Sequence, residues 1–129
     1  MKYLLDTCAF LFLINDPSSL SEAAQCALRE EKVDAFLSVI SVAEISIKEA
    51  KGKLRLPLPI LKWTEKALKH HSLKLLPLDL IPCTLAGQLP WVHSDPFDRL
   101  LIATALQHRL TLITADKEIQ KYPNIRTLW

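Results

Sequence analysis

The chain has 129 residues, of which 50% are hydrophobic and 23% are charged, and its formal net charge at pH 7 is +2. This composition is typical of one globular domain, residues 1–129, and excludes a disordered chain. The net charge is too small to indicate a nucleic-acid partner by itself, and with only two glycines, Gly52 and Gly87, the chain cannot form a Gly-rich phosphate-binding loop.

In chain order, the hydrophobic pattern first predicts a strand at 2–5 and a helix at 8–15 that stops before a proline. A serine-capped helix at 18–31 follows. A strand at 34–39 then leads into a helix at 41–51. This half of the chain therefore places helices after each of its two strands.

The second half continues the alternation after a proline-punctuated connector. The expected elements are a helix at 60–71, a strand at 74–78, helices at 80–88 and 95–109, a strand at 111–114, a short KEIQKY helix and an edge strand at 125–128. Because strands and helices alternate, we expect an α/β fold in three layers, with a central parallel β-sheet flanked by helices.

No apolar run approaches the roughly 18 residues that a membrane span needs, and no leader with a cleavage site opens the chain. The three cysteines, Cys8, Cys26 and Cys83, match neither a zinc-ligand pattern nor a disulfide framework. We therefore expect a cytoplasmic protein without membrane contact, whose cysteines are small core residues.

The helix at 41–51 carries a carboxylate, Glu44, on a face that it shares with Ile40 and Ile47. We expect Ser41 to cap this helix and Gly52 to end it. A buried unpaired carboxylate costs several kcal/mol, so Glu44 needs partners. Glu44 could take part in a capping interaction, form an ion pair with Lys48 one turn later, or bind a metal ion.

Four acids from distant parts of the chain are expected at one edge of the sheet, because ligands of parallel sheets bind beyond the carboxyl ends of the strands. These acids are Asp6, Glu44, Asp98 and Asp116. Carboxylates brought together raise each other's pKa, and Mg²⁺ or Mn²⁺ removes that conflict. Structural roles remain open as well, since Asp95, Asp98 and Asp116 all lie where a helix begins.

Four segments, LLDTCAFL, SVISVAEISIKEAKGKLRLP, HSDPFDRLLIATALQH and LTLITADKEI, occur in the order and spacing of the PIN domain. The resemblance runs from residue 2 to about residue 121 and is strongest to the VapC-type toxin ribonucleases. It implies a PIN-like fold and a metal-dependent endoribonuclease that hydrolyses RNA phosphodiester bonds. Cys8 and Ala43 depart from the usual pattern of the family, which puts the fit of the substrate in question rather than the chemistry.

Carried over to this chain, the resemblance implies that Asp6, Glu44, Asp98 and Asp116 are both the catalytic residues and the ligands of Mg²⁺ or Mn²⁺. It makes Thr114 a support of the acidic pocket, and Asp95 and Arg99 further supporting residues of the DPFDR segment. The resemblance also implies a homodimer, for which the apolar faces within 7–31 are candidates. A VapB-like antitoxin that blocks the pocket is implied in the same way.

Basic side chains that could steer the RNA backbone cluster after Glu44. They are Lys48, Lys51, Lys53 and Arg55, to which we add Arg99. A solvated helix end would explain the same cluster. We expect His93 and His108 to be structural or surface residues, and Trp63, Trp91 and Trp129 to lie in the core or an interface rather than to stack on bases.

Other functions compete with that of a toxin ribonuclease. A phosphoacceptor domain would use Asp6 as nucleophile, but Cys8 stands where one such family needs a second Asp, and TLIT is not followed by the lysine that the other needs. A housekeeping PIN-domain RNA-processing nuclease and a catalytically silent PIN-like module that binds RNA or protein remain. The presence of all four acids favours a nuclease.

Overall fold

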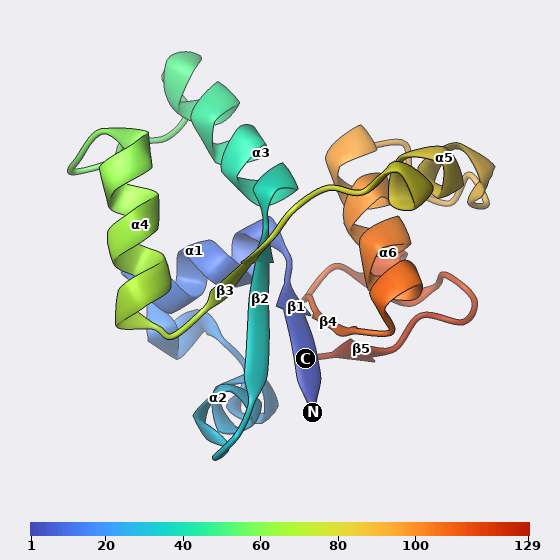
Figure 1. Ribbon diagram of the computed structural model, residues 1–129, viewed down its shortest axis with the longest axis horizontal. Coiled ribbons are helices and arrows are strands. Elements are labelled where there is room, and N and C mark those ends of the chain that lie inside the picture. Colours follow the sequence, from blue (N-terminus) through green and yellow to red (C-terminus); the bar gives the residue numbers. More distant parts are fainter.

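The computed structural model describes residues 1–129 and shows a five-stranded sheet with helices on both faces (Figure 1). The spatial order of the strands is β3-β2-β1-β4-β5, and every neighbouring pair is parallel. The strands are β1 Lys2–Leu5, β2 Asp34–Ser38, β3 Lys74–Leu76, β4 Thr111–Ile113 and β5 Thr127–Leu128. The predicted α/β fold with a parallel sheet is therefore confirmed.

Seven α-helices cover this sheet (Figure 1). They are α1 Thr7–Asn15, α2 Glu22–Arg29, α3 Val39–Ala50, α4 Ile60–His70, α5 Leu80–Gln88, α6 Pro96–His108 and α7 Lys117–Gln120. Each lies within two residues of its predicted bounds except α2, which begins at Glu22 with Ser21 as its cap. The residues Pro17–Ser19 before it form a 3-10 turn instead.

The start of α3 corrects one prediction. Strand β2 runs directly into α3, and the Ser38 hydroxyl accepts a hydrogen bond from the Ile40 N–H at 3.0 Å. Ser38 is therefore the N-cap, and Ser41 lies buried inside the first turn of the helix. The expected end of the helix is confirmed, because Gly52 has φ +74°, a left-handed conformation that glycine adopts without strain.

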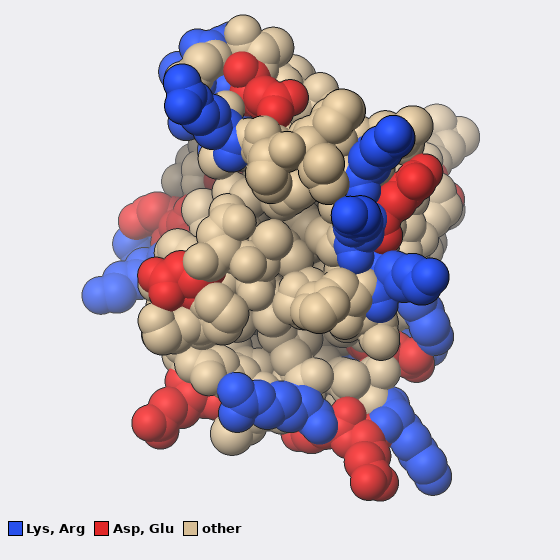
Figure 2. Space-filling view, turned by 90° about the vertical axis from the view of Figure 1, so that its left-hand side faces the viewer, with Lys and Arg blue, Asp and Glu red and all other residues tan.

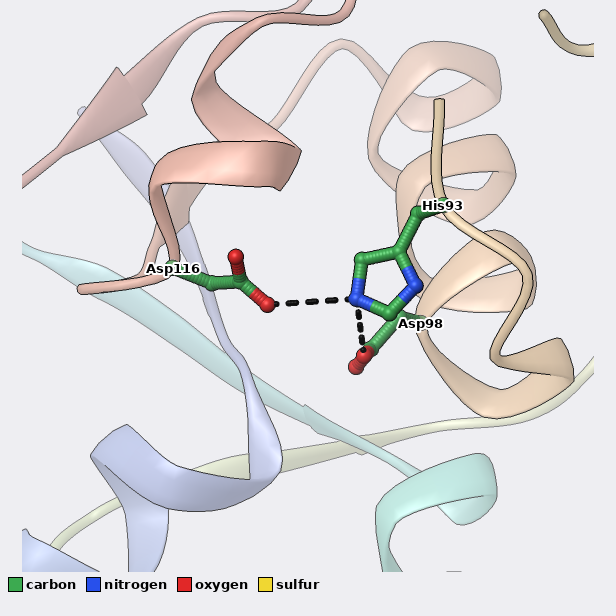
Figure 3. Close-up of side chains that lie close together, drawn as sticks. All are labelled: His93, Asp98 and Asp116. Carbon is green, nitrogen blue, oxygen red and sulfur yellow. Dashed lines mark hydrogen bonds and ion pairs between the residues drawn. The ribbon is translucent and has the colours of Figure 1, made fainter. Parts of the chain in front are cut away.

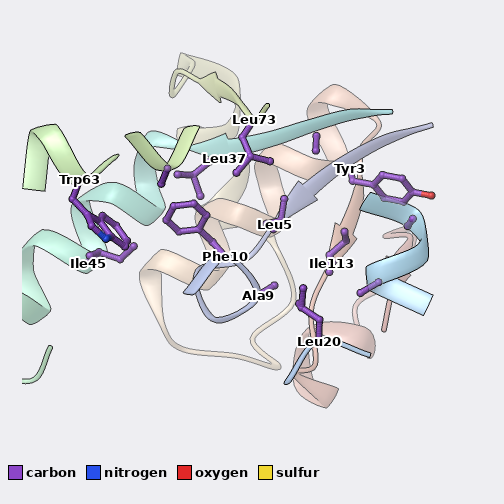
Figure 4. Close-up of a cluster of buried hydrophobic side chains, with 14 residues drawn as sticks. Tyr3, Leu5, Ala9, Phe10, Leu20, Leu37, Ile45, Trp63, Leu73 and Ile113 are labelled. Carbon is purple, nitrogen blue, oxygen red and sulfur yellow. The ribbon is translucent and has the colours of Figure 1, made fainter. Parts of the chain in front are cut away.

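Alternate side chains of the central strands point to opposite faces of the sheet, so each face has its own core. Tyr3 and Leu5 of β1 pack with residues of α1, α2 and α4 on one face (Figure 4). Leu4, between them, packs on the other face with Leu101 and Ile102 of α6. The sheet is thereby held on both sides, and the carboxyl ends of β1 and β4 are fixed next to α3 and α6.

The three cysteines differ from the sequence prediction, and Trp91 lies outside the core. Cys8, Cys26 and Cys83 are free thiols, but all three are exposed rather than part of the core. Trp63 is buried as expected, whereas Trp91 is 73% exposed. The periodicity of the sequence does not show which way a small or isolated side chain points. The exposure of these cysteines and tryptophans therefore follows from the folded structure alone.

The surface carries its charge unevenly. Figure 2 shows the face that includes α4, where uncharged side chains occupy the middle and most Lys, Arg, Asp and Glu side chains lie around the edge. No helix of the chain combines the length and the apolar character that a membrane crossing requires.

Candidate active site

The four predicted acids line one cavity of about 390 Å³ at the carboxyl end of the sheet, together with Asp95 and Lys48. Asp6 follows β1 and caps α1, since its Oδ1 accepts a hydrogen bond from the Ala9 N–H at 2.7 Å. Asp116 follows β4 and caps α7, where its Oδ1 accepts from the Glu118 N–H at 2.9 Å. Both acids therefore cap a helix and face the cavity at once.

The other two acids come from helices that flank the sheet. Glu44 lies in the second turn of α3 and is buried. Asp98 lies in the first turn of α6, whose N-cap is Asp95. The Asp95 carboxylate accepts from the N–H groups of Phe97 and Asp98 at 2.8 and 3.4 Å. The capping role that the sequence indicated for Asp95 is thus confirmed.

Glu44 has partners on both carboxylate oxygens. The Thr7 hydroxyl donates to Oε1 at 2.6 Å, and the Lys48 ammonium lies 3.0 Å from Oε2. Thr7 Oγ1 also lies 3.0 Å from the hydroxyl of Ser41, which ties α1 to α3 under the cavity. The ion pair with Lys48, one of the options open at the sequence level, is formed, and the contribution of Thr7 was missed.

Two of the acids have raised pKa values. Burial raises the pKa of Asp6, and the negative charges of Asp116 and Glu44 add to the effect, although hydrogen bonds from Thr114 and Ala9 oppose it. Burial raises the pKa of Asp98 to about 7, with further contributions from the charges of Asp95, Glu44 and Asp6. The raised pKa values show that burial disfavours the ionised form of both acids and that the neighbouring carboxylates add to this effect.

Thr114 connects two of these acids. It is fully buried directly after β4, and its hydroxyl faces the Asp6 carboxylate and lowers the pKa of that acid. Its Oγ1 also accepts from the Asp116 N–H at 3.0 Å. The hydroxyl thus fixes Asp6 and Asp116 relative to each other at the ends of neighbouring strands.

His93, which we expected to be a structural or surface residue, reaches into the acid cluster (Figure 3). Its Nε2 lies 3.0 Å from Asp98 Oδ2 and 3.2 Å from Asp116 Oδ2. Its Nδ1 accepts a hydrogen bond from the Asp95 N–H at 3.1 Å, so the ring proton of the neutral imidazole sits on Nε2 and faces both carboxylates. In this tautomer His93 is a hydrogen-bond donor that holds two repelling acids together rather than a metal ligand.

The one signal in the sequence for His93 is its place in the loop directly before the α6 N-cap. A loop that ends at Asp95 must pass the acids at the start of α6. Nothing in local periodicity shows which way its imidazole points.

Arg99 does not take part in the cavity, which corrects its prediction as an RNA contact. Its side chain is 3% exposed, and it makes six hydrogen bonds of 2.7 to 3.3 Å. The acceptors are the carbonyls of Ala86, Leu89, Pro90 and His93 and the hydroxyl of Tyr122. Because Ala86 and Leu89 lie at the C-terminal end of α5, Arg99 satisfies carbonyls that the helix leaves unpaired.

The other predicted RNA contacts divide into two groups. Lys48 lines the acidic cavity, while Lys51, Lys53 and Arg55 are exposed beyond the last turn of α3. Figure 2 shows basic side chains grouped at the top of the molecule, at the height where α3 ends in Figure 1. The three outer cations can therefore contact a long anion only where it extends away from the cavity.

The donor set of the cavity fits a hard divalent cation. Asp6, Glu44, Asp98 and Asp116 offer carboxylate oxygens, the ligands that Mg²⁺ and Mn²⁺ favour. Against five acids including Asp95, the cavity lining itself supplies one lysine, Lys48. A cation held by these oxygens would favour the ionised form of Asp6 and Asp98, which burial and the neighbouring carboxylates disfavour.

Metal affinity is expected to depend on pH through Asp98. Because the pKa of Asp98 is about 7 in the metal-free protein, a proton occupies this carboxyl below that pH and a cation must displace it. Affinity for Mn²⁺ should therefore rise about tenfold per pH unit below pH 7 and level off above it. Calorimetric titration with Mn²⁺ from acidic to alkaline pH measures this profile. An affinity that stays constant over the range contradicts the proposed role of Asp98.

Comparison with known proteins identifies one matching family and similar proteins from several bacteria. The model of the PIN domain family matches residues 3–125. Ribonuclease VapC22 of Mycobacterium tuberculosis is 28% identical over 129 residues, covering 98% of this chain and 97% of that protein.

Two solved structures show the same fold at low identity. The VapBC2 complex of Rickettsia felis, bound to a DNA fragment from its promoter, matches with a TM-score of 0.73 and 21% identity, over 100% of this chain and 99% of that chain. VapBC-1 of nontypeable Haemophilus influenzae matches with a TM-score of 0.68 and 22% identity, over 99% and 97% of the two chains.

Proposed function

This chain belongs to the PIN domain family, and on that premise we propose that it is a divalent-metal-dependent endoribonuclease, the toxin of a VapBC-type toxin–antitoxin pair. One observation carries the proposal. Four acids from β1, α3, α6 and β4–α7 converge on one cavity whose lining includes one cation, Lys48. The name of the mycobacterial relative, a ribonuclease, supports the reaction class.

In this proposal Asp6, Glu44, Asp98 and Asp116 hold one or two Mg²⁺ or Mn²⁺ ions. The bound cation supplies activation of water and neutralisation of phosphate charge. The chain's own residues position the site: Thr114 and His93 keep the acids in place, and Lys48 offers a positive charge to the substrate phosphate. No side chain is needed as a covalent nucleophile.

Cleavage of RNA by the purified chain tests the proposal. Single-stranded and hairpin RNA should be cut internally with Mg²⁺ or Mn²⁺, and EDTA should stop the reaction. Products with 5′-phosphate and 3′-hydroxyl ends are expected. Binding of RNA without any cleavage, in the presence of either ion, would instead identify a catalytically silent RNA-binding module.

We further propose a VapB-like antitoxin as partner, because the solved relatives include complexes named VapBC. An apolar groove of about 510 Å³ between α3 and α4 is a suitable surface for it. It includes Val42 and Ala43 of α3 and Leu61 of α4, which is 70% exposed. The buried hydroxyl of Thr64 in this groove has no hydrogen-bond partner within the chain.

Growth experiments separate a toxin from a housekeeping nuclease. Expression of the chain should arrest growth, and co-expression of a small reading frame next to its gene should restore it. We place the protein in the cytoplasm, where its RNA substrate is, as a single PIN domain over residues 1–129. A homodimer through the apolar sides of α1 and α2 belongs to the same proposal, and light scattering of the purified chain tests it.

A further inference from the structure

Trp91 lies in the loop between α5 and α6 and is 73% exposed. An exposed indole offers a large flat face on which another ring can stack. One face of its ring covers the Arg99 guanidinium, whose central carbon lies 3.6 Å from the ring centroid. The opposite face of the indole is the part left to solvent.

The surface beneath the indole is rigid. Arg99 is held by six hydrogen bonds to carbonyl and hydroxyl oxygens, as described above. The cation–π contact between the desolvated guanidinium and the indole face holds the ring in place. Trp91 is therefore fixed before any ligand arrives, and little side-chain entropy is lost when a flat group stacks on it.

The position of Trp91 connects it to the acidic cavity. It precedes His93 by two residues, so their Cα atoms lie within about 7 Å of each other. His93 contacts Asp98 and Asp116 through Nε2, and its carbonyl accepts from Arg99 at 3.1 Å. Trp91, Arg99 and His93 thus form one connected unit that leads from the exposed indole to two of the proposed metal ligands.

We propose that the outer face of Trp91 stacks an unpaired base of the RNA close to the scissile phosphate; this rests on the proposed nuclease function. A phosphate among the acids brings adjoining bases of the same strand to the α5–α6 loop. Stacking of a base on an aromatic side chain is worth about 1–3 kcal/mol and accepts any base, because every base has a π-face. Bases inside a duplex are already stacked, so the substrate class is single-stranded or looped RNA.

Tryptophan fluorescence tests the stacking directly. Trp63 is 5% exposed and Trp129 is half-buried, so Trp91 is the tryptophan that a stacked base can reach and quench. A single-stranded RNA decamer of mixed sequence, titrated in Mg²⁺ into the Asp98→Asn chain so that it is not cut, should quench the emission. The same strand annealed to its complement should quench it much less.

Variants of Trp91 separate stacking from structural support. In the same background, Trp91→Leu keeps an apolar cover over Arg99 but has no π-face, so RNA affinity should fall about 5- to 100-fold. Trp91→Phe should retain most of the affinity. Leu80→Ala, which removes a comparably exposed apolar side chain from α5, should leave RNA affinity unchanged. Thermal melts of all three variants check that the fold persists.

The fluorescence and affinity measurements distinguish base stacking on Trp91 from a protein contact and from the nuclease proposal. RNA that binds Trp91→Leu as tightly as its parent, or that leaves the emission of the parent unchanged, overturns the stacking proposal. A Trp91→Leu chain that loses only self-association or binding to the co-expressed antitoxin marks Trp91 as a protein contact and overturns it too. If the unmutated chain cuts no RNA while quenching persists, the nuclease proposal fails and the stacking stands.

Discussion

Replacing Asp98 by asparagine is expected to lower RNA cleavage by on the order of a thousandfold or more. The amide cannot supply the charge that an ion at the cavity requires, and electrostatic stabilisation of this kind is worth several kcal/mol in the transition state. Asp6→Asn should have the same effect, because Asp6 lines the same cavity and is also buried. Single-turnover cleavage of a labelled RNA measures both losses.

The same substitution is expected to stabilise the metal-free protein near neutral pH. The pKa of Asp98 is about 7 in the folded protein, against 3.8 as the ordinary value. A raised pKa means that the folded state binds the proton more tightly, so the contribution of Asp98 to stability is largest below pH 4 and is lost as pH rises towards 7. Asp98→Asn should remove this loss and raise the free energy of unfolding above pH 7 by on the order of 1 to 3 kcal/mol.

Two comparisons make this prediction specific. Asp79→Asn, a change of the same kind outside the cavity, should leave cleavage unchanged. Glu44→Gln should abolish cleavage without a gain in stability, because Thr7 and Lys48 already compensate the Glu44 carboxylate. If urea unfolding showed that metal-free Asp6→Asn and Asp98→Asn are both unfolded or strongly destabilised, the acids would be structural.

Arg99→Met is expected to destabilise the chain by about 3–5 kcal/mol, a large part of the 5–15 kcal/mol that holds a domain folded. The substitution leaves the buried carbonyls of Ala86 and Leu89 without donors and removes the cation from the C-terminal end of α5. It also frees the loop that carries His93. Urea unfolding monitored by circular dichroism measures the loss.

Matched variants distinguish this structural role from RNA binding. Arg55→Met removes an exposed arginine and should change stability by no more than about 0.5 kcal/mol. Arg99→Lys keeps the charge but not the planar guanidinium with its five donors, so it should restore only part of the lost stability. An Arg99→Met chain with unchanged stability and weakened RNA binding would reinstate the arginine as a substrate contact.

Most of the fold could be predicted from local patterns. The helix at 80–88 was predicted with its observed bounds, and strands 2–5 and 34–39 differ from β1 and β2 by at most one residue. Alternation of strands and helices was enough to predict a parallel sheet. The start of α3 was missed because Ser38 and Ser41 are both possible caps, and the direct junction of β2 with α3 selects the first.

The acids of the candidate site could be predicted for a related reason. Asp6 and Asp116 follow strands, and parallel strands bring their carboxyl ends to one edge whatever the loops between them do. Their partners could not be predicted in this way. Thr7 meets Glu44 across 37 positions of the chain, and His93 meets Asp116 across 23, so each contact exists only after the helices have packed.

Local sequence was therefore sufficient for the elements, the order of the layers and the four carboxylates, because periodicity and strand ends act over a few residues. Long-range packing alone determined which polar groups have hydrogen-bond partners, which acids have pKa values raised by burial and neighbouring charge, and which side chains remain exposed to solvent. Arg99 looked like a surface cation and is the buried cap of α5, while Trp91, expected in the core or an interface, lies outside the core. The free-energy cost of burying a charged group or of exposing an aromatic ring depends on neighbouring groups that only the folded chain brings together.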